Sequence, residues 1–267
     1  MVVSVEISGI LEERLRRLVD LGIYATVAEA VRDAVREFLK NLDLKEIALE
    51  LYLKRGATFQ YTVEFAGETY ESMMDYFISK GVLPLVGALR EEDLALLGPG
   101  EYVLDGVTLY VAYKSGLVEV MKRLRGEGYR FLAPRQLEVL SEVLEARRIL
   151  EGLKRVEVVE FVAGKPVRLG DLVTPVEASA IGYASSRGIV LLSDDARTRE
   201  LARDRGVRAY SSASLIATLM VLDEDEALEY ASAYRSVPAL LPDEALRAAA
   251  LTGQHRLRGE LASGDRV

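Results

Sequence analysis

The second half of the chain alternates strand-like and helix-like segments, and this alternation limits the possible folds more than any other feature. From Tyr102 onward, short segments rich in Val, Leu, Ile and aromatic residues are each followed by a segment with helical spacing. The expected strands cover 102–112, 129–134, 156–162, 188–195 and 207–211, and the expected helices cover 118–124, 135–153, 176–186, 196–206 and 213–222. Strands joined by such helices form right-handed crossovers, so we predict an α/β domain with a mainly parallel sheet.

Acidic residues recur where these strands end. Asp105 lies where the first expected strand runs into a turn, Asp194 and Asp195 close the fourth, and Glu177 stands in the first turn of a helix that begins near Pro175. Ligands of parallel sheets bind beyond the carboxyl ends of the strands, and a divalent cation neutralises clustered carboxylates. The pattern therefore predicts a site for Mg²⁺ or Mn²⁺ that activates water on a phosphodiester. For each residue alone, and for Asp194-Asp195 above all, a helix cap is the alternative.

The composition excludes several other chemistries. The 267 residues include no cysteine, which excludes thiolate metal sites. The single histidine, His255, lies in an expected terminal helix, which disfavours Ser-His-Asp catalysis. A net charge of −8 provides no general attraction for nucleic acid, so any nucleic-acid site must be local. No apolar run reaches the roughly 18 to 20 residues of a membrane span, and charged residues occupy the place of a signal peptide. We expect a cytoplasmic protein without a membrane partner.

Residues 101–222 resemble PIN-domain nucleases, particularly the VapC-like toxins that are encoded beside antitoxins. The clearest stretch is VEASAIGYASSRGIVLLSDDARTRELARDRGVRAYSSASLIATL. The resemblance implies a PIN-like fold and a metal-dependent endoribonuclease with RNA as its substrate. It also implies that Asp105, Glu177 and Asp195 bind the metal, that Asp194 lies beside them, and that Ser212 orients water or phosphate.

Two departures from the family bear on this activity. The family usually has Ser, Thr or Asn two residues after the first aspartate, where this chain has Val107, with Thr108 next to it. It also has a glutamate in the helix after the second strand, at the position of Leu140, and here Glu138 and Glu142 lie two residues to either side. Two alternatives follow from these departures: a shifted ligand, and a weakened or lost metal site.

The first 42 residues follow the order strand, helix, helix. VVSVEIS alternates apolar and polar residues, as a half-buried strand does. Helical spacing starts at Leu11, Gly22 is expected to end the first helix, and Thr26 and Glu29 form a capping box that opens the second. A lone strand has no partner within this segment, so the pattern predicts a homodimer.

This segment resembles the ribbon-helix-helix domain of CopG and VapB type antitoxins, most closely in GIYATVAEAVRDAVREFL. In that family two chains pair their first strands, and the outward side chains of this ribbon enter the major groove of operator DNA. Here the DNA-facing residues would be Ser4, Glu6 and Thr26. Glu6 departs from the family's basic or amide residues, because a carboxylate accepts hydrogen bonds only from cytosine and repels phosphates. Dimerisation without DNA reading is the alternative.

Residues 43–97 contain three expected helices, with a stop at Gly56 and caps at Thr58 and Thr69. They resemble a small family of helix-turn-helix antitoxins. The helix after Thr69 has an apolar stripe made of Tyr70, Met73, Met74, Phe77 and Ile78. Because its presumed recognition surface carries Glu68, Glu71 and Asp75 and no arginine, a protein-facing role is favoured over groove binding. We expect a domain boundary at Gly98-Pro99-Gly100 and a helical extension over 223–267, with a helix that starts at Pro242.

Two functional hypotheses follow. The first is a ribonuclease of PIN type that is self-inhibited, with residues 43–97 covering its cleft and residues 1–42 forming a dimer. In it, Lys54, Arg55 or Arg90 would reach the carboxylates in place of the metal. The second is a DNA-binding transcriptional regulator whose PIN domain is catalytically degenerate.

Overall fold

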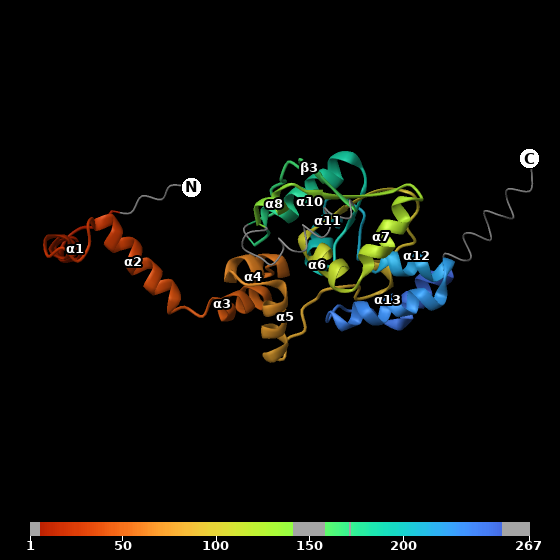
Figure 1. Ribbon diagram of the computed structural model, residues 1–267, viewed down its shortest axis with the longest axis horizontal. Helices are drawn as coiled ribbons and strands as arrows, with labels where there is room; N and C mark the ends of the chain where they lie inside the picture. Colours follow the sequence, from red (N-terminus) through yellow and green to blue (C-terminus); the bar gives the residue numbers. More distant parts are fainter. Residues whose placement is uncertain (1–5, 141–157, 171, 253–267) are drawn as a thin grey trace, which may run out of the picture. The chain divides into compact units, whose positions relative to one another are not determined.

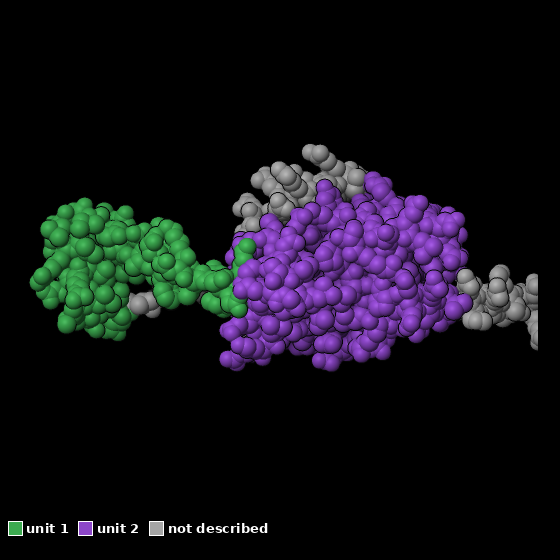
Figure 2. Space-filling model, turned by 90° about the horizontal axis from the view of Figure 1, so that it is seen from below, with its two compact units in different colours: residues 1–47 green, residues 48–267 purple. Residues whose placement is uncertain are grey.

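The computed structural model describes residues 6–140, 158–170 and 172–252. The chain divides into two compact units, residues 1–47 and 48–267, which Figure 2 shows in different colours. The sequence placed divisions after residue 42 and at 98–100. In the structure, residues 48–97 instead pack into the same unit as the sheet.

The second unit contains a five-stranded sheet in which all neighbouring strands are parallel, in the order β3-β2-β1-β4-β5. The strands are β1 (Gly100–Leu104), β2 (Tyr129–Pro134), β3 (Val159–Val162), β4 (Val190–Leu192) and β5 (Ala209–Tyr210). Tyr102 of the central strand pairs with Phe131 on one side and Val190 on the other. The expectation of an α/β domain with a parallel sheet is confirmed.

Helices cover both faces of this sheet (Figure 1). They are α6 (Gly106–Lys114), α7 (Leu117–Arg125), α8 (Gln136–Leu140), α10 (Pro175–Arg187), α11 (Ala196–Arg203), α12 (Ser214–Leu222) and α13 (Glu224–Ser236), and residues 243–252 are also helical. Val103 and Leu191 point to a core that includes Ala180 and Ile181 of α10. Leu104, on the opposite face, belongs to a larger core with α6, α7 and α12.

The stretch 102–112, expected as a strand that runs into a turn, is helical in its second half. β1 ends at Leu104, and the apolar run from Gly106 to Ala112 is the start of α6. Asp105 caps this helix, because its side chain accepts a hydrogen bond from the Thr108 amide. Every residue from Gly106 to Ala112 is buried, so the run shows no polar face from which its helical period could be read.

Helices are present where the sequence predicts them between residues 43 and 97. Helix α3 (Leu44–Glu50) continues into a π-helical turn η1 (Leu51–Arg55), and α4 (Phe59–Ala66), α5 (Tyr70–Ser79) and a 3₁₀ turn η2 (Glu91–Asp93) follow. Gly56 adopts the left-handed conformation that ends η1. Thr58 and Thr69 cap α4 and α5 through their hydroxyl oxygens.

The segment 48–97 shares a core with the sheet. Met73, Met74 and Phe77 of α5 are buried in the same apolar cluster as Tyr102 and Leu104, whereas Ile78 of the expected stripe is 42% exposed. The Tyr129 hydroxyl also donates to the Leu97 carbonyl across the expected boundary (2.8 Å). A chain that began at residue 98 would lose part of its own core.

The first unit consists of α1 (Ile10–Asp20) and α2 (Val27–Lys40). The Thr26 side chain accepts from the Glu29 amide as expected, but the Glu29 carboxylate accepts from the Ala25 amide, one residue outside a true capping box. Large apolar side chains are exposed on these helices and on the turn between them, and they are Ile10, Leu11, Leu21, Ile23, Val35, Phe38 and Leu39.

Several expectations fall outside the described residues. These are Ser4 and most of the expected ribbon, Glu142 with the later part of the 135–153 helix, and His255. The described residues Glu6 and Ile7 are not in a strand, since a two-chain ribbon needs a partner chain. Within the described ranges, no helix is long and apolar enough to cross a membrane.

Candidate active site

Three carboxylates meet the amino-terminal ends of three helices at the carboxyl edge of the sheet. Asp105 follows β1 and caps α6, Asp195 follows β4 and caps α11, and Glu177 is the third residue of α10. All three are buried. Unpaired amides and the positive end of the helix dipole favour acidic residues at such positions, so the helix-cap interpretation is correct for each of them.

Hydrogen bonds from Ser193 and Thr198 connect the three acidic residues. The Thr198 hydroxyl of α11 donates to Oε1 of Glu177 (2.5 Å). Ser193, at the end of β4, donates to Oδ2 of Asp105 and lies 3.2 Å from the backbone carbonyl of Asp195. The structure therefore brings together the three residues that the sequence selected.

Asp105 is held by the residue next to the expected hydroxyl position. Its Oδ1 accepts from the Thr108 amide (2.9 Å). The Thr108 hydroxyl donates to the Leu192 carbonyl (3.2 Å) and accepts from the Asp194 amide (2.8 Å), which ties α6 to the end of β4. Val107 is fully buried in the core and takes no part in this polar network.

Glu177 accepts four hydrogen bonds from hydroxyl and amide donors. Besides Thr198, the Thr174 amide and hydroxyl each donate to Oε2 at 2.9 Å, and Thr174 and Glu177 complete a capping box. The fourth donor is the hydroxyl of Thr58, also 2.9 Å from Oε2. This last donor belongs to the segment 48–97.

Asp195 is also contacted by that segment. Its Oδ1 accepts from the amides of Arg197 and Thr198 (2.9 and 3.4 Å), as a helix cap does. Its Oδ2 accepts from the backbone amide of Phe59 at 2.5 Å. Thr58 and Phe59 are the cap and first residue of α4, so the amino-terminal end of α4 contacts two of the three carboxylates.

A second part of the same segment lies along the aspartate pair. The Gly87 amide donates to the Asp194 carbonyl (2.7 Å), and the Ala196 amide donates to the Leu85 carbonyl (3.0 Å). Val86 forms an antiparallel bridge with Asp195. Residues 85–87 and the start of α4 thus both contact the loop that carries Asp194 and Asp195.

The basic residues expected to replace the metal do not fill that role. Lys54 forms an ion pair with Glu50, and Arg90 forms one with Glu92; all four side chains are largely exposed. Arg55 is exposed as well. Neutral donors reach the carboxylates instead, because the start of α4 directs the Thr58 hydroxyl and the unpaired Phe59 amide toward them.

Burial changes the acidity of all three groups. Burial raises the pKa of Glu177 to about 8, and the neighbouring Asp195 charge adds to this. Burial also raises the pKa of Asp105 to about 6 and raises the pKa of Asp195. The hydrogen-bond donors around each carboxylate oppose these shifts only in part.

The chemistry of this site suits a hard divalent cation, although the present arrangement does not cage one. Among the described residues, no three carboxylate or imidazole side chains are placed to hold one ion together. Two buried oxygen atoms, Gln60 Oε1 and the Tyr70 hydroxyl, have no hydrogen-bond partner within the described part of the chain. Both lie beside Gly106, less than 3 Å from where a β-carbon would stand. Carboxylate and amide oxygens are the ligands that Mg²⁺ takes, so the donor set fits such an ion.

Asp194 and Ser212 contact each other in a separate buried network. Asp194 Oδ1 accepts from the Ser211 hydroxyl, the Ser212 amide and the Tyr234 hydroxyl at 2.6 to 2.9 Å, and Oδ2 accepts from the Ser212 hydroxyl (2.5 Å). This network joins the end of β4 to α13. Its hydrogen bonds support a role in positioning the loop.

A buried ion pair supports the same loop. Arg199 donates to the Ser193 carbonyl (2.7 Å) and pairs with Asp93 (3.2 Å), which also pairs with Arg203 (2.9 Å). Although burial raises the pKa of Asp93, the two guanidinium groups and the Leu89 amide outweigh it, so this pKa lies below its ordinary value.

Sequence reasoning missed most of the supporting donors. Thr174 carried a readable signal, because Thr-Pro-Val-Glu before an apolar run matches a capping box. The sequence marks Thr58 as a helix cap but carries no sign of its contact with Glu177. Ser193 and Thr198 carry no local signal. Glu138, one candidate for the shifted ligand, pairs with Arg135 (3.7 Å).

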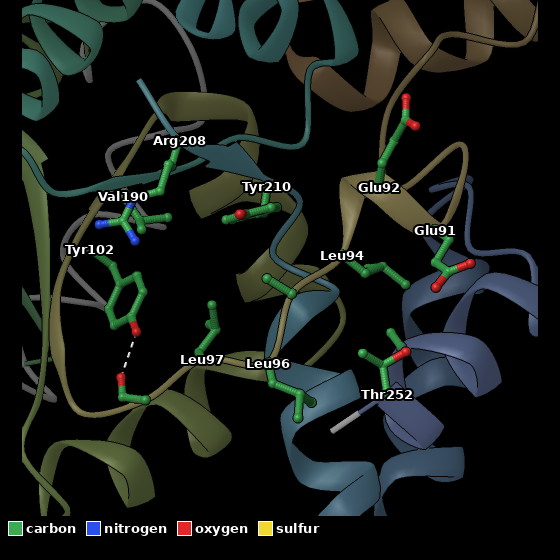
Figure 3. Close-up of a pocket in the computed structure, with 13 residues that line it drawn as sticks. Glu91, Glu92, Leu94, Leu96, Leu97, Tyr102, Val190, Arg208, Tyr210 and Thr252 are labelled. Carbon is green, nitrogen blue, oxygen red and sulfur yellow. Dashed lines mark hydrogen bonds between the residues drawn. The ribbon is translucent and has the colours of Figure 1, made fainter. Parts of the chain in front are cut away.

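A pocket of about 650 Å³ lies elsewhere in this unit (Figure 3). Tyr102, Arg208 and Tyr210 line it together with the loop residues Leu94 and Leu97. None of its lining residues belongs to the carboxylate site.

In the first unit, Glu6 and Thr26 are exposed, and the Thr26 hydroxyl caps α2.

No family model, curated protein or solved structure matches this chain.

Proposed function

We propose that this protein is a metal-dependent endoribonuclease of PIN type whose site is inhibited by its own antitoxin-like segment. One observation carries the proposal: Asp105, Glu177 and Asp195 are buried together at the carboxyl edge of a parallel sheet. Carboxylates with raised pKa values in a shared polar site are typical of catalytic centres rather than of plain helix caps.

In this function Asp105, Glu177 and Asp195 would hold Mg²⁺ or Mn²⁺. The cation would supply a Lewis acid that lowers the pKa of a bound water and stabilises charge on the phosphate. Thr198 and Ser193 would keep the carboxylates in place through their hydroxyl groups. The donors from residues 48–97 occupy carboxylate oxygens that this chemistry needs, which supports an inhibited resting state.

The test uses full-length protein, because residues 48–97 share the core of the sheet. Thr58→Asp keeps a good helix cap for α4 but sets a negative charge against Glu177, which should displace the start of α4. With Mn²⁺, this variant should cleave single-stranded RNA at least about tenfold faster than wild type. Thr69→Asp makes the same change at the cap of α5 and should behave as wild type.

Two further controls identify the site. Adding Asp195→Asn to Thr58→Asp should abolish cleavage, because it removes one charge from the cation site. Chelation of the divalent cation should do the same. If the folded Thr58→Asp protein cleaves no RNA at any Mn²⁺ concentration, the ribonuclease proposal is refuted.

A DNA-binding regulator with a degenerate PIN domain is the second candidate. It is favoured by the absence of a metal-holding arrangement among the described residues and by the apolar side chain of Val107 in the core. In this case the dimeric protein would retard the DNA upstream of its own coding sequence in a gel, in a sequence-specific manner. Such binding, together with no RNA cleavage by Thr58→Asp, would establish the regulator.

A further inference from the structure

The inhibitory contact uses backbone and hydroxyl donors in place of a charged side chain. Thr58 and Phe59 direct one hydroxyl and one amide at Glu177 Oε2 and Asp195 Oδ2. Both donors stand at the amino-terminal end of α4, where the helix dipole is equivalent to roughly half a positive charge. This end of α4 therefore provides, weakly, the positive charge that a divalent cation would provide strongly.

Arg197 fastens this end of α4 to the sheet domain. Its guanidinium donates to the Ala57 carbonyl at 2.6 Å and lies 4.1 Å from the centre of the Tyr52 ring. The Tyr52 hydroxyl in turn accepts a hydrogen bond from the Leu85 amide (2.8 Å). Arg197 therefore contacts both Ala57, which precedes the α4 cap, and Tyr52, which holds residues 85–87.

The position of Arg197 is unusual for a cation. It is the second residue of α11 and lies two positions after the Asp195 cap. The helix dipole disfavours a positive charge at this end of a helix. Its contacts are made to the antitoxin-like segment, through Ala57 and Tyr52. These contacts stabilise the Arg197 guanidinium at a position that the helix dipole disfavours.

We propose that the start of α4 is a built-in cation substitute, latched by Arg197, and that a divalent cation at Glu177 and Asp195 releases it. This inference rests on the proposed function for the identity of the cation site. The same two oxygens cannot accept from Thr58 and Phe59 and also bind a cation fully. Cation binding and α4 docking are therefore reciprocally coupled: a bound cation weakens the docking of α4 by the same factor by which docked α4 weakens cation binding.

Hydrogen exchange of the full-length protein tests the latch without any RNA. In EDTA, Arg197→Gln should increase exchange of the peptide that covers 57–63 by about tenfold, because one hydrogen bond to a carbonyl and one cation–π contact are lost. Arg205→Gln is the matched control, since the exposed Arg205 guanidinium also donates to a backbone carbonyl, that of Arg168 (2.7 Å). It should leave this peptide unchanged.

Addition of Mn²⁺ tests the exchange between cation and helix. In wild type, Mn²⁺ should deprotect 57–63, and Arg197→Gln should bind Mn²⁺ about tenfold more tightly by calorimetry. Tighter binding with unchanged exchange in EDTA would show that Arg197 acts only by charge repulsion and would overturn the latch. Protection of 57–63 that does not respond to Mn²⁺ would overturn the competition.

These outcomes are separable from the ribonuclease proposal. If Mn²⁺ releases α4 but Thr58→Asp cleaves no RNA, the device stands and the nuclease proposal fails. If RNA is cleaved while Mn²⁺ leaves α4 protected, the device fails and the nuclease proposal stands.

Discussion

Replacement of Glu177 by glutamine should stabilise the protein at high pH and leave it nearly unchanged at low pH. Glutamine has nearly the same shape, and its carbonyl oxygen can take the place of Oε2 as the acceptor for Thr58 and Thr174. Its amide nitrogen would then face Thr198, whose hydroxyl can turn from donor to acceptor. The substitution therefore removes a buried charge while it keeps the hydrogen bonds.

The sign of the effect follows from the raised pKa of this side chain. Burial raises the pKa of Glu177 from 4.5 to about 8, so the folded protein holds the proton more tightly than the unfolded chain does. The protonated form contributes its full stability below pH 4.5, and this contribution is lost as the pH rises toward 8 and above. Glutamine cannot ionise and so does not show this loss.

The magnitude follows from the same pKa difference. A rise from 4.5 to about 8 corresponds to roughly 4 to 5 kcal/mol of linked free energy, of which about 3 kcal/mol is lost between pH 5 and pH 8. We therefore expect Glu177→Gln to be more stable than wild type by about 4 kcal/mol at pH 8 and to differ by no more than about 1 kcal/mol at pH 5.

Urea unfolding in EDTA, followed by circular dichroism at pH 5, 6, 7 and 8, measures this difference. Asp75→Asn removes a charge of the same sign from an exposed position on α5 and should not reproduce the pH dependence. A Glu177→Gln protein that is less stable than wild type at pH 8, or whose advantage does not change with pH, would refute this account of a buried and uncompensated carboxylate.

Two further predictions concern the supporting ion pair and the first unit. Arg199→Met should lower the free energy of unfolding by about 3 to 5 kcal/mol, because it leaves the buried Asp93 carboxylate with only Arg203 as a partner. Urea titration measures this loss, and a value below about 1 kcal/mol would contradict the prediction. Phe38, which is 63% exposed on α2, should lie in a homodimer interface, so Phe38→Glu should convert a dimer into a monomer by light scattering with unchanged helix content. A variant that stays dimeric would place the interface elsewhere.

Much of the local structure was determined by the sequence itself. The alternating segments predicted the parallel sheet, Thr58 and Thr69 marked the starts of α4 and α5, and Asp105, Glu177 and Asp195 were selected by their places at strand and helix ends. These features depend on backbone propensity and on hydrogen bonds between residues three or four positions apart, so a linear pattern records them.

Tertiary structure alone decided what surrounds these carboxylates. Thr58 and Glu177 are 119 positions apart, and no periodicity connects them. The expected boundary at Gly98-Pro99-Gly100 does not separate compact units. A glycine-proline turn reflects local backbone geometry, and it carries no information on the packing of α4 and α5 against α6 and the sheet. Sequence patterns pointed to cationic side chains as partners of the carboxylates, whereas the fold supplies a helix end, because a buried anion accepts whichever donors the packing brings within about 3 Å.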